Sequence, residues 1–427
     1  MKLKLLGLFL GLTLIASSVF ALEGSIHLVT YQPYGFRVDE TDQGQRVRRL
    51  LLKLHDLGIR TLIFDFRGRM VTGRSSDIDS VTPPEFRATE EHYLKETITY
   101  AKSLGFEIAI RPILLVVGPS WEFPYVENGF TWWHGNIRPD DPTAWFNKYF
   151  EFHERYLRIA AEVGAKWYSL GAEMHSMTSG LGERNPASPH GYPAEWVKLI
   201  QRAREIVGPS VQLTYGVNYT DQYVLEEGER SWGGEFEQWR YDITFLARTP
   251  EDIEHQTQMR TLWRSFDFIG LDFYRSLGTA QDEYPKTLSE LSDKLYEYSS
   301  SHVGHLYWAW TTMSQISGAS PPMALQEIGY ASVENCFVAP YLYEDDKAKV
   351  NFLHQAAAWD ALLRALTEPL PTANWMKEIG IWQVLVDDDS DEFPKGGFSP
   401  LGKPLTIDVL KKYLMLSNSK KAKLPAH

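Results

Sequence analysis

VRRLLLKLHDLGIRTLIFDF, residues 47–66 of this 427-residue chain, shows most directly the pattern that predicts its fold. Its first part, Val47–Leu57, carries apolar residues at helical spacing and stops at Gly58. Its second part, Thr61–Phe66, is a short apolar run with the composition of a buried strand. The order helix, glycine, strand is typical of a unit in which a helix packs back onto a parallel sheet.

The same pattern recurs along the chain and predicts eight strands. They are Ser25–Tyr31, Thr61–Phe66, Glu107–Leu115, Lys166–Gly171, Val211–Val217, Phe266–Tyr274, Met323–Ile328 and Ile379–Val386. Further amphipathic helices are expected at Glu90–Leu104, Trp145–Val163, Glu195–Val207, Lys347–Leu366 and Ile407–Leu416. Eight strands that alternate with helices close a barrel, so the sequence predicts a (β/α)8 TIM barrel.

One domain is the simplest organisation for this length. No Pro-, Ser- or Gly-rich linker divides the chain, although its length alone would also allow two or three domains. We therefore expect the barrel to occupy residues 22–416 and a basic tail to occupy residues 417–427. Two long loops, Val116–Asp141 and Met174–Ala194, follow strands and are rich in aromatic residues, which favours the walls of a substrate cleft.

The N-terminus has the pattern of a secretory signal peptide. A basic start at Lys2 and Lys4 precedes an apolar run, Leu5–Ile15, and small residues up to Ala21. The run is too short for a comfortable membrane span. We therefore expect residues 1–21 to be removed and the protein to be secreted or periplasmic, with no stable membrane association afterwards.

Charge and cysteine content argue against a nucleic-acid partner and against an intramolecular disulfide. The net charge of −12 repels phosphate backbones and argues against a nucleic-acid partner. The single cysteine, Cys336, cannot form an intramolecular disulfide, so the core must supply the stability. Neither feature determines the oligomeric state.

The strongest functional signal is a pair of glutamates at the ends of predicted strands four and seven. Glu173 follows YSLGA, residues 168–172, and Glu327 lies within LQEIGY, residues 325–330. Cleavage of a glycosidic bond needs two carboxyl groups, one that donates a proton to the leaving oxygen and one that attacks or stabilises the anomeric carbon. A single glutamate is more often a solvated loop residue or an ion-pair partner, whereas the pair at the mouth of a barrel favours catalysis.

These local sequences resemble glycoside hydrolase family 113, the β-mannanases, within the clan A glycoside hydrolases. Gly171-Ala172-Glu173 is similar to the strand-four motif of the family and Glu327-Ile328-Gly329-Tyr330 to its strand-seven motif. LTYGVN at 213–218, FDFIGLDFY at 266–274 and GFSPLGKP at 397–404 are similar to its strand-five, strand-six and C-terminal patterns. The similarity covers most of the chain after the signal peptide.

The resemblance implies roles for the two glutamates. Glu173 would be the general acid/base and Glu327 the nucleophile, with net retention of anomeric configuration and carboxyl groups about 5 to 5.5 Å apart. Glu173 should then have a raised pKa, caused by the charge of its neighbour and by partial desolvation. Two departures concern substrate contacts: Ala172 stands where the family usually has Thr, and the Lys-Pro-His-x-Asp pattern reads RPILL at 111–115.

Other residues at the predicted mouth are candidates for binding sugar. Arg111 takes the place of the Lys of the family pattern, and flat aromatic side chains can stack on the C–H faces of sugars. The candidates for substrate binding are Arg111, Trp121, Trp132, Asn218, Asp272, Tyr274, Tyr330 and Trp382. Most of the 14 tryptophans, including Trp308 and Trp310, are expected in the core. His175 is more typical of a structural role than of a ligand contact.

No cofactor or metal is indicated. Strand one offers a single histidine, His27, and no His-Glu-x-x-His or Gly-x-Gly-x-x-Gly motif occurs. The acidic run 387–392 lacks the glycine-centred spacing of an EF-hand loop, which favours a solvated loop over a calcium site. The sequence thus predicts a secreted retaining glycoside hydrolase acting on a β-linked glycan, most consistent with β-1,4-mannan. The alternatives are an inactive carbohydrate-binding barrel and a glycosidase for another glycan.

Overall fold

The structure is a computed structural model of the chain. It describes residues 22–32, 34–179, 190–220, 223–224, 230–231, 234–245, 247–342, 348–368, 370–371, 375–387 and 396–421. The predicted signal peptide therefore lies outside the described residues. Within them, no helix has both the length and the apolar character needed to cross a membrane.

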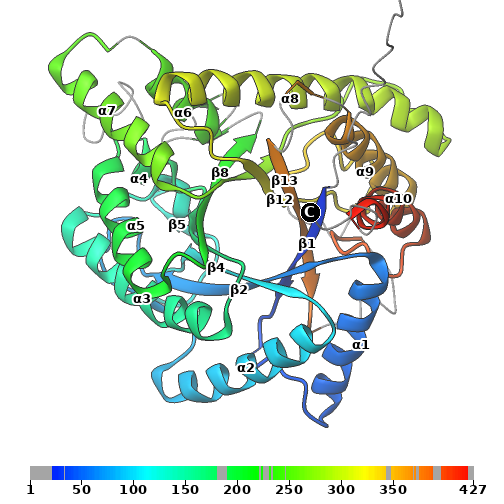
Figure 1. The fold of residues 1–427 in the computed structure, drawn as a ribbon, viewed down its shortest axis with the longest axis horizontal. Helices are drawn as coiled ribbons and strands as arrows, with labels where there is room; N and C mark the ends of the chain where they lie inside the picture. The colour runs from blue at the N-terminus through cyan, green and yellow to red at the C-terminus, as the bar shows by residue number, and fades with distance from the viewer. Residues whose placement is uncertain are drawn as a thin grey trace, which may run out of the picture.

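Eight parallel strands close into a barrel, which Figure 1 shows as a ring with helices around it. The ring closes because β1 pairs with both β2 and β13, and a short strand, β3 (Ile78–Ser80), adds to β2 in the antiparallel direction. The barrel strands are β1 (Glu23–Val29), β2 (Thr61–Met70), β4 (Glu107–Val116), β7 (Trp167–Ala172), β8 (Gln212–Thr220), β11 (Ile269–Tyr274), β12 (Met323–Ile328) and β13 (Met376–Leu385). The predicted (β/α)8 TIM barrel is confirmed.

Each predicted strand overlaps an observed one, and the largest differences lie at strand ends. β2 continues to Met70, beyond the predicted end at Phe66, and β4 pairs with it up to Val116. The apolar run stops at Phe66 because polar Arg67 and Arg69 then alternate with the remaining residues of the strand. The sixth strand begins at Ile269 and the eighth at Met376.

The expected helices correspond to observed helices with slightly different bounds. They are α1 (Asp42–Leu57), α2 (Arg87–Ser103), α3 (Pro142–Val163), α5 (Pro193–Val207), α9 (Phe352–Thr367) and α10 (Pro404–Lys421). The Thr41 and Asp141 side chains accept hydrogen bonds from the first turns of α1 and α3. Gly58 and Gly164 end these helices in the left-handed region, with φ of 95° and 59°. α10 runs into the predicted basic tail.

Elements that the sequence pattern did not predict complete the shell. They are α4 (His175–Thr178), α6 (Gly234–Thr244), α7 (Pro250–Ser265), α8 (Leu288–Ser317), the single-turn helices η1 (Pro84–Phe86) and η2 (His134–Asn136), and the short strands β5 (Tyr125–Glu127), β6 (Phe130–Trp132), β9 (Tyr223–Val224) and β10 (Arg230–Ser231). α8 runs along one side of the barrel (Figure 1). On it, Trp310 is buried as expected, whereas Trp308 is exposed under the Arg240 guanidinium, which corrects the prediction for Trp308.

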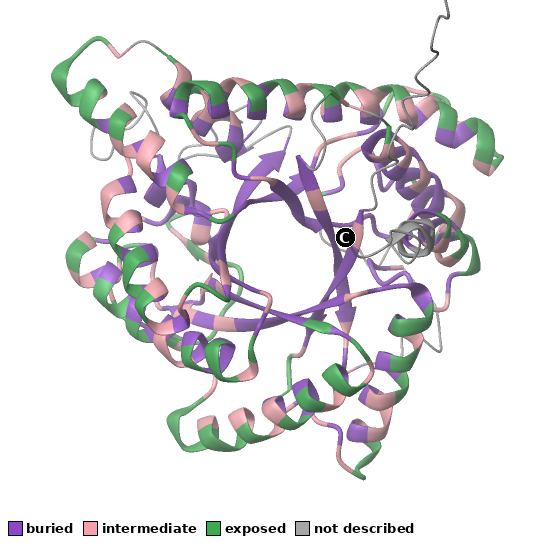
Figure 2. Cartoon of the chain, in the orientation of Figure 1, coloured by how far each residue is buried: buried purple, intermediate pink, exposed green. Residues whose placement is uncertain are grey.

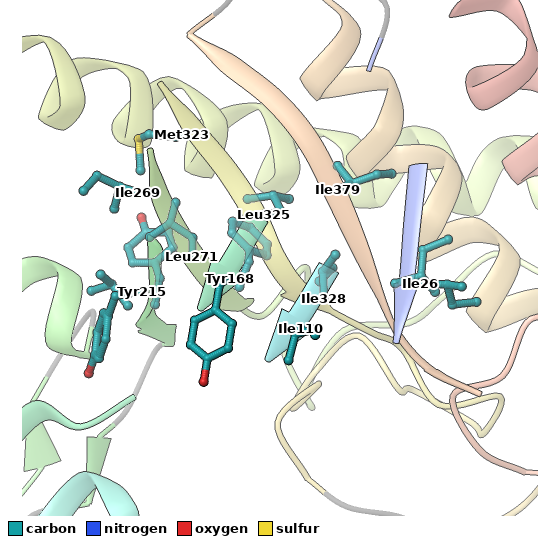
Figure 3. Packing of buried hydrophobic residues seen from close by; sticks show 14 of the residues in the cluster. Ile26, Ile110, Tyr168, Tyr215, Ile269, Leu271, Met323, Leu325, Ile328 and Ile379 are labelled. Carbon is teal, nitrogen blue, oxygen red and sulfur yellow. The ribbon is translucent and has the colours of Figure 1, made fainter. Parts of the chain in front are cut away.

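The core contains one large and two smaller apolar clusters. The strands and the inner faces of the helices are buried, while the outer faces of the helices are exposed (Figure 2). Between strands and helices lies a large apolar cluster, of which Figure 3 shows members such as Ile26, Leu271 and Ile379. A smaller cluster is formed by Ile63, Ala109, Trp167, Phe268 and Ala324. Burial of this amount of apolar surface stabilises the barrel and gives the strand ends a rigid base.

Candidate active site

Polar side chains at the C-terminal ends of the strands lie at one level around the barrel. Strand register pairs Asp65 of β2 with Arg111 of β4. It also pairs Asp272 of β11 with Asn218 of β8 and with Glu327 of β12. Since side chains at this end of a TIM barrel form its active site, this layer is the candidate site.

Glu327 reaches this layer because β12 departs from strict alternation. Leu325 pairs with Leu271, and the next pair joins Glu327 to Asp272, so Gln326 is an extra residue in β12. A bulge of this kind re-aims the side chain that follows it. Regular alternation from the outward Leu325 would have turned Glu327 toward the helices instead.

Both oxygens of the Glu327 carboxylate accept hydrogen bonds. Arg111 Nη1 donates to Oε2 at 2.7 Å, and Tyr274 Oη donates to Oε1 at 2.5 Å. The residue is 9% exposed. Burial and the charge of Glu327 raise the pKa of Tyr274 well above its ordinary value, so the phenol remains a donor. The carboxylate is therefore held in one orientation with one side open to solvent.

Arg111 and Asp272 lie next to Glu327 and support it. Both are fully buried, and Arg111 Nη2 donates to Asp272 Oδ2 at 2.7 Å. Burial raises the pKa of Asp272 well above its ordinary value although the Arg111 charge opposes this. The two side chains were predicted to contact sugar, but their complete burial beside Glu327 gives them a positioning role in this structure.

A second pair, Asp65 and His27, continues the network beside Arg111. Asp65 Oδ1 lies 3.8 Å from Arg111 Nη1, and Asp65 Oδ2 lies 2.7 Å from His27 Nδ1. The other ring nitrogen of His27 faces the Gln326 carbonyl oxygen at 2.8 Å. A carbonyl oxygen only accepts, so His27 Nε2 carries a proton and donates it to this bond. The bulged segment of β12 is thereby tied to β1 and β2.

Glu173 stands at the end of β7 in an unusual backbone conformation. Its φ is +53°, in the left-handed region that residues other than glycine rarely adopt, and its N–H donates to the Gly216 carbonyl at 2.7 Å. Such strain, of order 1–2 kcal/mol, clusters at functional sites. Asn218 Nδ2 donates to Glu173 Oε1, and His134 Nε2 lies 3.4 Å from Oε2.

The surroundings of Glu173 lower its pKa, which contradicts the expected raised value for the free protein. Burial would raise the pKa of Glu173, but the hydrogen bond and charge of His134 act in the opposite direction. The hydrogen bond from Asn218 and the charge of Arg111 lower it further. The sequence argument considered burial and the neighbouring carboxylate and missed these donors.

Glu235, at the start of α6, is a buried carboxyl group that the sequence pattern did not reveal. It accepts from the Tyr215 hydroxyl at 2.9 Å, from the Asn218 backbone N–H at 3.2 Å and from the Thr178 hydroxyl. Tyr215 also accepts a hydrogen bond from the Met174 N–H. Burial raises the pKa of Glu235 to about 8 against the effect of these donors. Glu235 therefore links the segment that carries Glu173 to the one that carries Asn218.

The three predicted sugar-stacking tryptophans differ in exposure. Trp121 is 56% exposed and has the Arg69 guanidinium 4.0 Å from its ring centroid. Trp382 is nearly buried, and its ring meets that of His27 edge-on at 5.0 Å, so it belongs to the inner wall. Trp132 is also nearly buried and donates through Nε1 to Glu127, which leaves little of its face for a sugar.

Tyr330 and His175 are both buried in this structure. Tyr330 is fully buried and packs edge-on against Trp359 of α9, which corrects the expectation that it lines the site. The chain turns outward after Gly329, and Tyr330 joins the core outside the barrel. His175 is buried as well, and burial lowers its pKa to about 3, which keeps the ring neutral.

The described residues contain no group of three or more His, Cys, Asp or Glu side chains arranged to hold a metal ion. Asp387, the first residue of the acidic run, accepts from the Thr30 hydroxyl at 2.7 Å and from the Tyr31 N–H at 2.5 Å. It therefore fixes the loop after β1. The rest of that run lies outside the described residues.

Comparison with known proteins adds a family and a fold. The model of Glycoside Hydrolase Family 113 matches residues 30–232. The family 113 β-mannanase AaManA from Alicyclobacillus acidocaldarius, in complex with ManMIm, is 16% identical over 93% of this chain and 97% of that chain, with a TM-score of 0.60. A family 113 β-1,4-mannanase complex is 15% identical over 92% and 99% of the two chains, with a TM-score of 0.57. At these identities the structural likeness concerns the fold. No curated protein matches the chain.

Proposed function

The chain belongs to Glycoside Hydrolase Family 113 and is a glycoside hydrolase, and from this premise we propose that it cleaves β-1,4-mannan with retention of anomeric configuration. The observation that carries the proposal is the pair of strand-end glutamates with different partners. Glu327 accepts from Arg111 and Tyr274, whereas Glu173 accepts from Asn218 and lies beside His134. Two carboxyl groups in unlike surroundings are the requirement for this chemistry.

In the proposed reaction Glu327 attacks the anomeric carbon while Glu173 donates a proton to the leaving oxygen. Glu173 then removes a proton from water, and the resulting hydroxide displaces Glu327 from the glycosyl intermediate. Retention by this route requires the two carboxyl groups to stand about 5 to 5.5 Å apart in the complex with substrate. Bound glycan would exclude water around Glu173 and so raise its pKa from the lowered value of the free enzyme.

The proposed substrate rests on the family and on the described activity of two similar proteins, which are a β-mannanase and a β-1,4-mannanase. Ile113 and Leu115 lie on the inward face of β4, the face that also carries Arg111. These apolar side chains stand where the family pattern has polar ones, so the contacts around the reacting sugar differ from those of the family. This difference favours the second candidate, a barrel that binds glycan without turnover.

We also propose that the enzyme is exported and that residues 1–21 are a cleaved signal peptide, on the basis of the basic, apolar and small-residue pattern of that segment. Protein recovered from the periplasm or medium of an expressing bacterium should begin at Leu22. An N-terminus at Met1 in the recovered protein would contradict this proposal.

The test is a reducing-sugar assay on mannan, glucomannan, xylan and cellulose, with NMR of the first product to read its anomeric configuration. Wild-type protein should release β-configured ends from mannan, and Glu327→Gln should lower kcat by at least about 10³-fold with an unchanged Tm. Glu173→Gln should lose much less activity on an aryl glycoside with a good leaving group than on mannan, because that group needs little protonation.

Three outcomes of this assay decide between the candidates. Equal loss of activity on both substrates in Glu173→Gln would contradict the acid role. An α-configured first product would contradict retention. Absence of turnover on every glycan, together with glycan binding, would establish the second candidate.

A further inference from the structure

The inward face of β2 continues beyond Asp65 to the end of the strand at Met70. Ile63 belongs to the smaller buried cluster and Asp65 contacts His27 and Arg111 in the layer above it. Side chains alternate along a strand, so Arg67 and Arg69 share this face and stand about 7 and 13 Å further along than Asp65. β2 remains paired with β4 up to Met70, which keeps both arginines on a regular strand.

Each of the two arginines lies against an exposed aromatic ring from a neighbouring loop. The Arg67 guanidinium is 4.2 Å from the ring centroid of Tyr31, which is 59% exposed. The Arg69 guanidinium is 4.0 Å from the ring centroid of Trp121. Arg67 Nη1 donates to the Thr30 carbonyl at 2.8 Å, and Arg69 Nη2 donates to the Gly118 carbonyl at 2.9 Å. These contacts fix the guanidinium groups and leave further N–H groups for a ligand.

Among the residues that the structure describes, no carboxylate forms an ion pair with Arg67 or Arg69. Arginines elsewhere on the molecule do have such partners, for example Arg37 with Asp39, Arg87 with Asp79 and Arg204 with Asp267. The whole chain carries a net charge of −12, so carboxylates are plentiful. Two cations without a carboxylate partner among the described residues therefore lie beyond the candidate active site, on the inward face of β2, in an acidic protein.

We propose that Arg67 and Arg69, with Tyr31 and Trp121, form an outer subsite for a sugar that carries a carboxylate, such as a uronic acid unit of the glycan. A guanidinium group matches a carboxylate with two parallel hydrogen bonds. The guanidinium covers one face of the adjacent ring, and the opposite face can stack against the C–H face of a neighbouring sugar. This inference rests on the proposed function, since it names the chemical class of glycan that the same cleft prefers.

The test measures binding to the Glu327→Gln variant by calorimetry, so that turnover does not interfere. The probes are mannohexaose and two forms of it, each oxidised to a carboxylate at C6 of one terminal unit, either the reducing or the non-reducing end. At low salt we expect one oxidised form to bind about tenfold more tightly than mannohexaose. The difference should shrink at 0.5 M NaCl because the subsite is partly exposed.

Replacement of both arginines distinguishes this subsite from general attraction of charge. Arg67→Gln with Arg69→Gln, in the Glu327→Gln background, should abolish the preference and leave the affinity for mannohexaose within about twofold. The Lys versions of both substitutions should restore part of it, since they keep the charge but lose the fork geometry. Arg202→Gln is the matched control, because Arg202 lies over the Phe150 ring at 3.6 Å on the outer helices. It should change nothing.

Two results would overturn the subsite. One is equal or weaker binding of both oxidised forms relative to mannohexaose, and the other is a preference that survives removal of both arginines. Hydrolysis of neutral mannan by the wild-type protein in the same experiments would leave the proposed function standing in either case. Conversely, a lack of hydrolysis on every glycan would remove the proposed function, while arginine-dependent binding of an oxidised form would still be measured.

Discussion

At each end of the barrel a cation contacts three carboxylates. The two clusters differ in how well the positive charge compensates the negative charges. At the N-terminal end, Lys166 Nζ contacts Glu23 and lies 3.0 Å from Glu107 and 2.9 Å from Glu378. The charges of Glu378 and Glu23 raise the pKa of Lys166, and the charge of Lys166 lowers that of Glu23, although burial of each acts against this. Lys166 and Glu23 are therefore both stabilised in their charged forms.

At the C-terminal end of the barrel the carboxylates surround Arg111, which has no access to solvent. Arg111 is fully buried among Asp272, Glu327 and Asp65. Burial, together with the charges of Glu327 and Glu173, raises the pKa of Asp272 although Arg111 is adjacent. Charge pairs at the N-terminal end of a TIM barrel contribute stability, and those at the C-terminal end serve the chemistry. The imbalance around Arg111 is the physical sign of that difference.

Removal of Arg111, the cation at the C-terminal end of the barrel, should have the largest effect. In Arg111→Met, Glu327 loses the donor that orients it, and kcat on mannan should fall by about 10²-fold or more. Stability should fall as well, by about 3–5 kcal/mol, because buried carboxylates lose their counter-charge. Arg111→Lys keeps the charge and should recover part of both. Unchanged kcat in Arg111→Met, measured well below its Tm, would show that Arg111 does not position the nucleophile.

Removal of Lys166, the cation at the N-terminal end of the barrel, should lower stability without changing activity. Lys166→Met leaves Glu23 and Glu378 without their shared partner, so the free energy of unfolding should fall by about 3–5 kcal/mol while kcat at 25 °C stays within twofold. Lys198→Met is the control, since its ion pair with Glu195 on α5 is exposed and worth at most about 1 kcal/mol. A large drop in kcat for Lys166→Met at 25 °C would remove the contrast between the two ends.

The sequence predicts the architecture well because its apolar residues recur at the spacing of helices in some segments and form short strand-like runs in others. Apolar runs locate all eight strands, a glycine follows four of the predicted helices, and the glutamates fall at strand ends as expected. α8 escaped prediction because its 30 residues bury only a narrow set of side chains, so the apolar stripe is weak. The extension of β2 beyond Phe66 was not predicted because Arg67 and Arg69 are not typical of a buried strand.

The detail of the site depends on features that a single sequence does not display. Glu327 points inward because of a bulge at Gln326, and Glu173 has a left-handed backbone that its residue type does not suggest. His134 lies in a long loop without periodicity, so nothing in the sequence brings it to Glu173. The alternation of Asp65 and Arg111 with apolar neighbours, in contrast, did offer a signal that both side chains face the barrel interior.

The smallest expected effect concerns His134, which lies beside Glu173 and gives it surroundings that differ from those of Glu327. Its hydrogen bond and charge lower the pKa of Glu173, against the effect of burial. Activity needs protonated Glu173 and is lost as the pH rises through the pKa of that group. In His134→Gln the charge is gone and the pKa of Glu173 should rise, so the alkaline limb of kcat/KM against pH should move to higher pH. His92→Gln, an exposed histidine on α2, is the control and should leave the limb in place. An alkaline limb that stays or moves to lower pH in His134→Gln would mean that His134 does not set the protonation of Glu173.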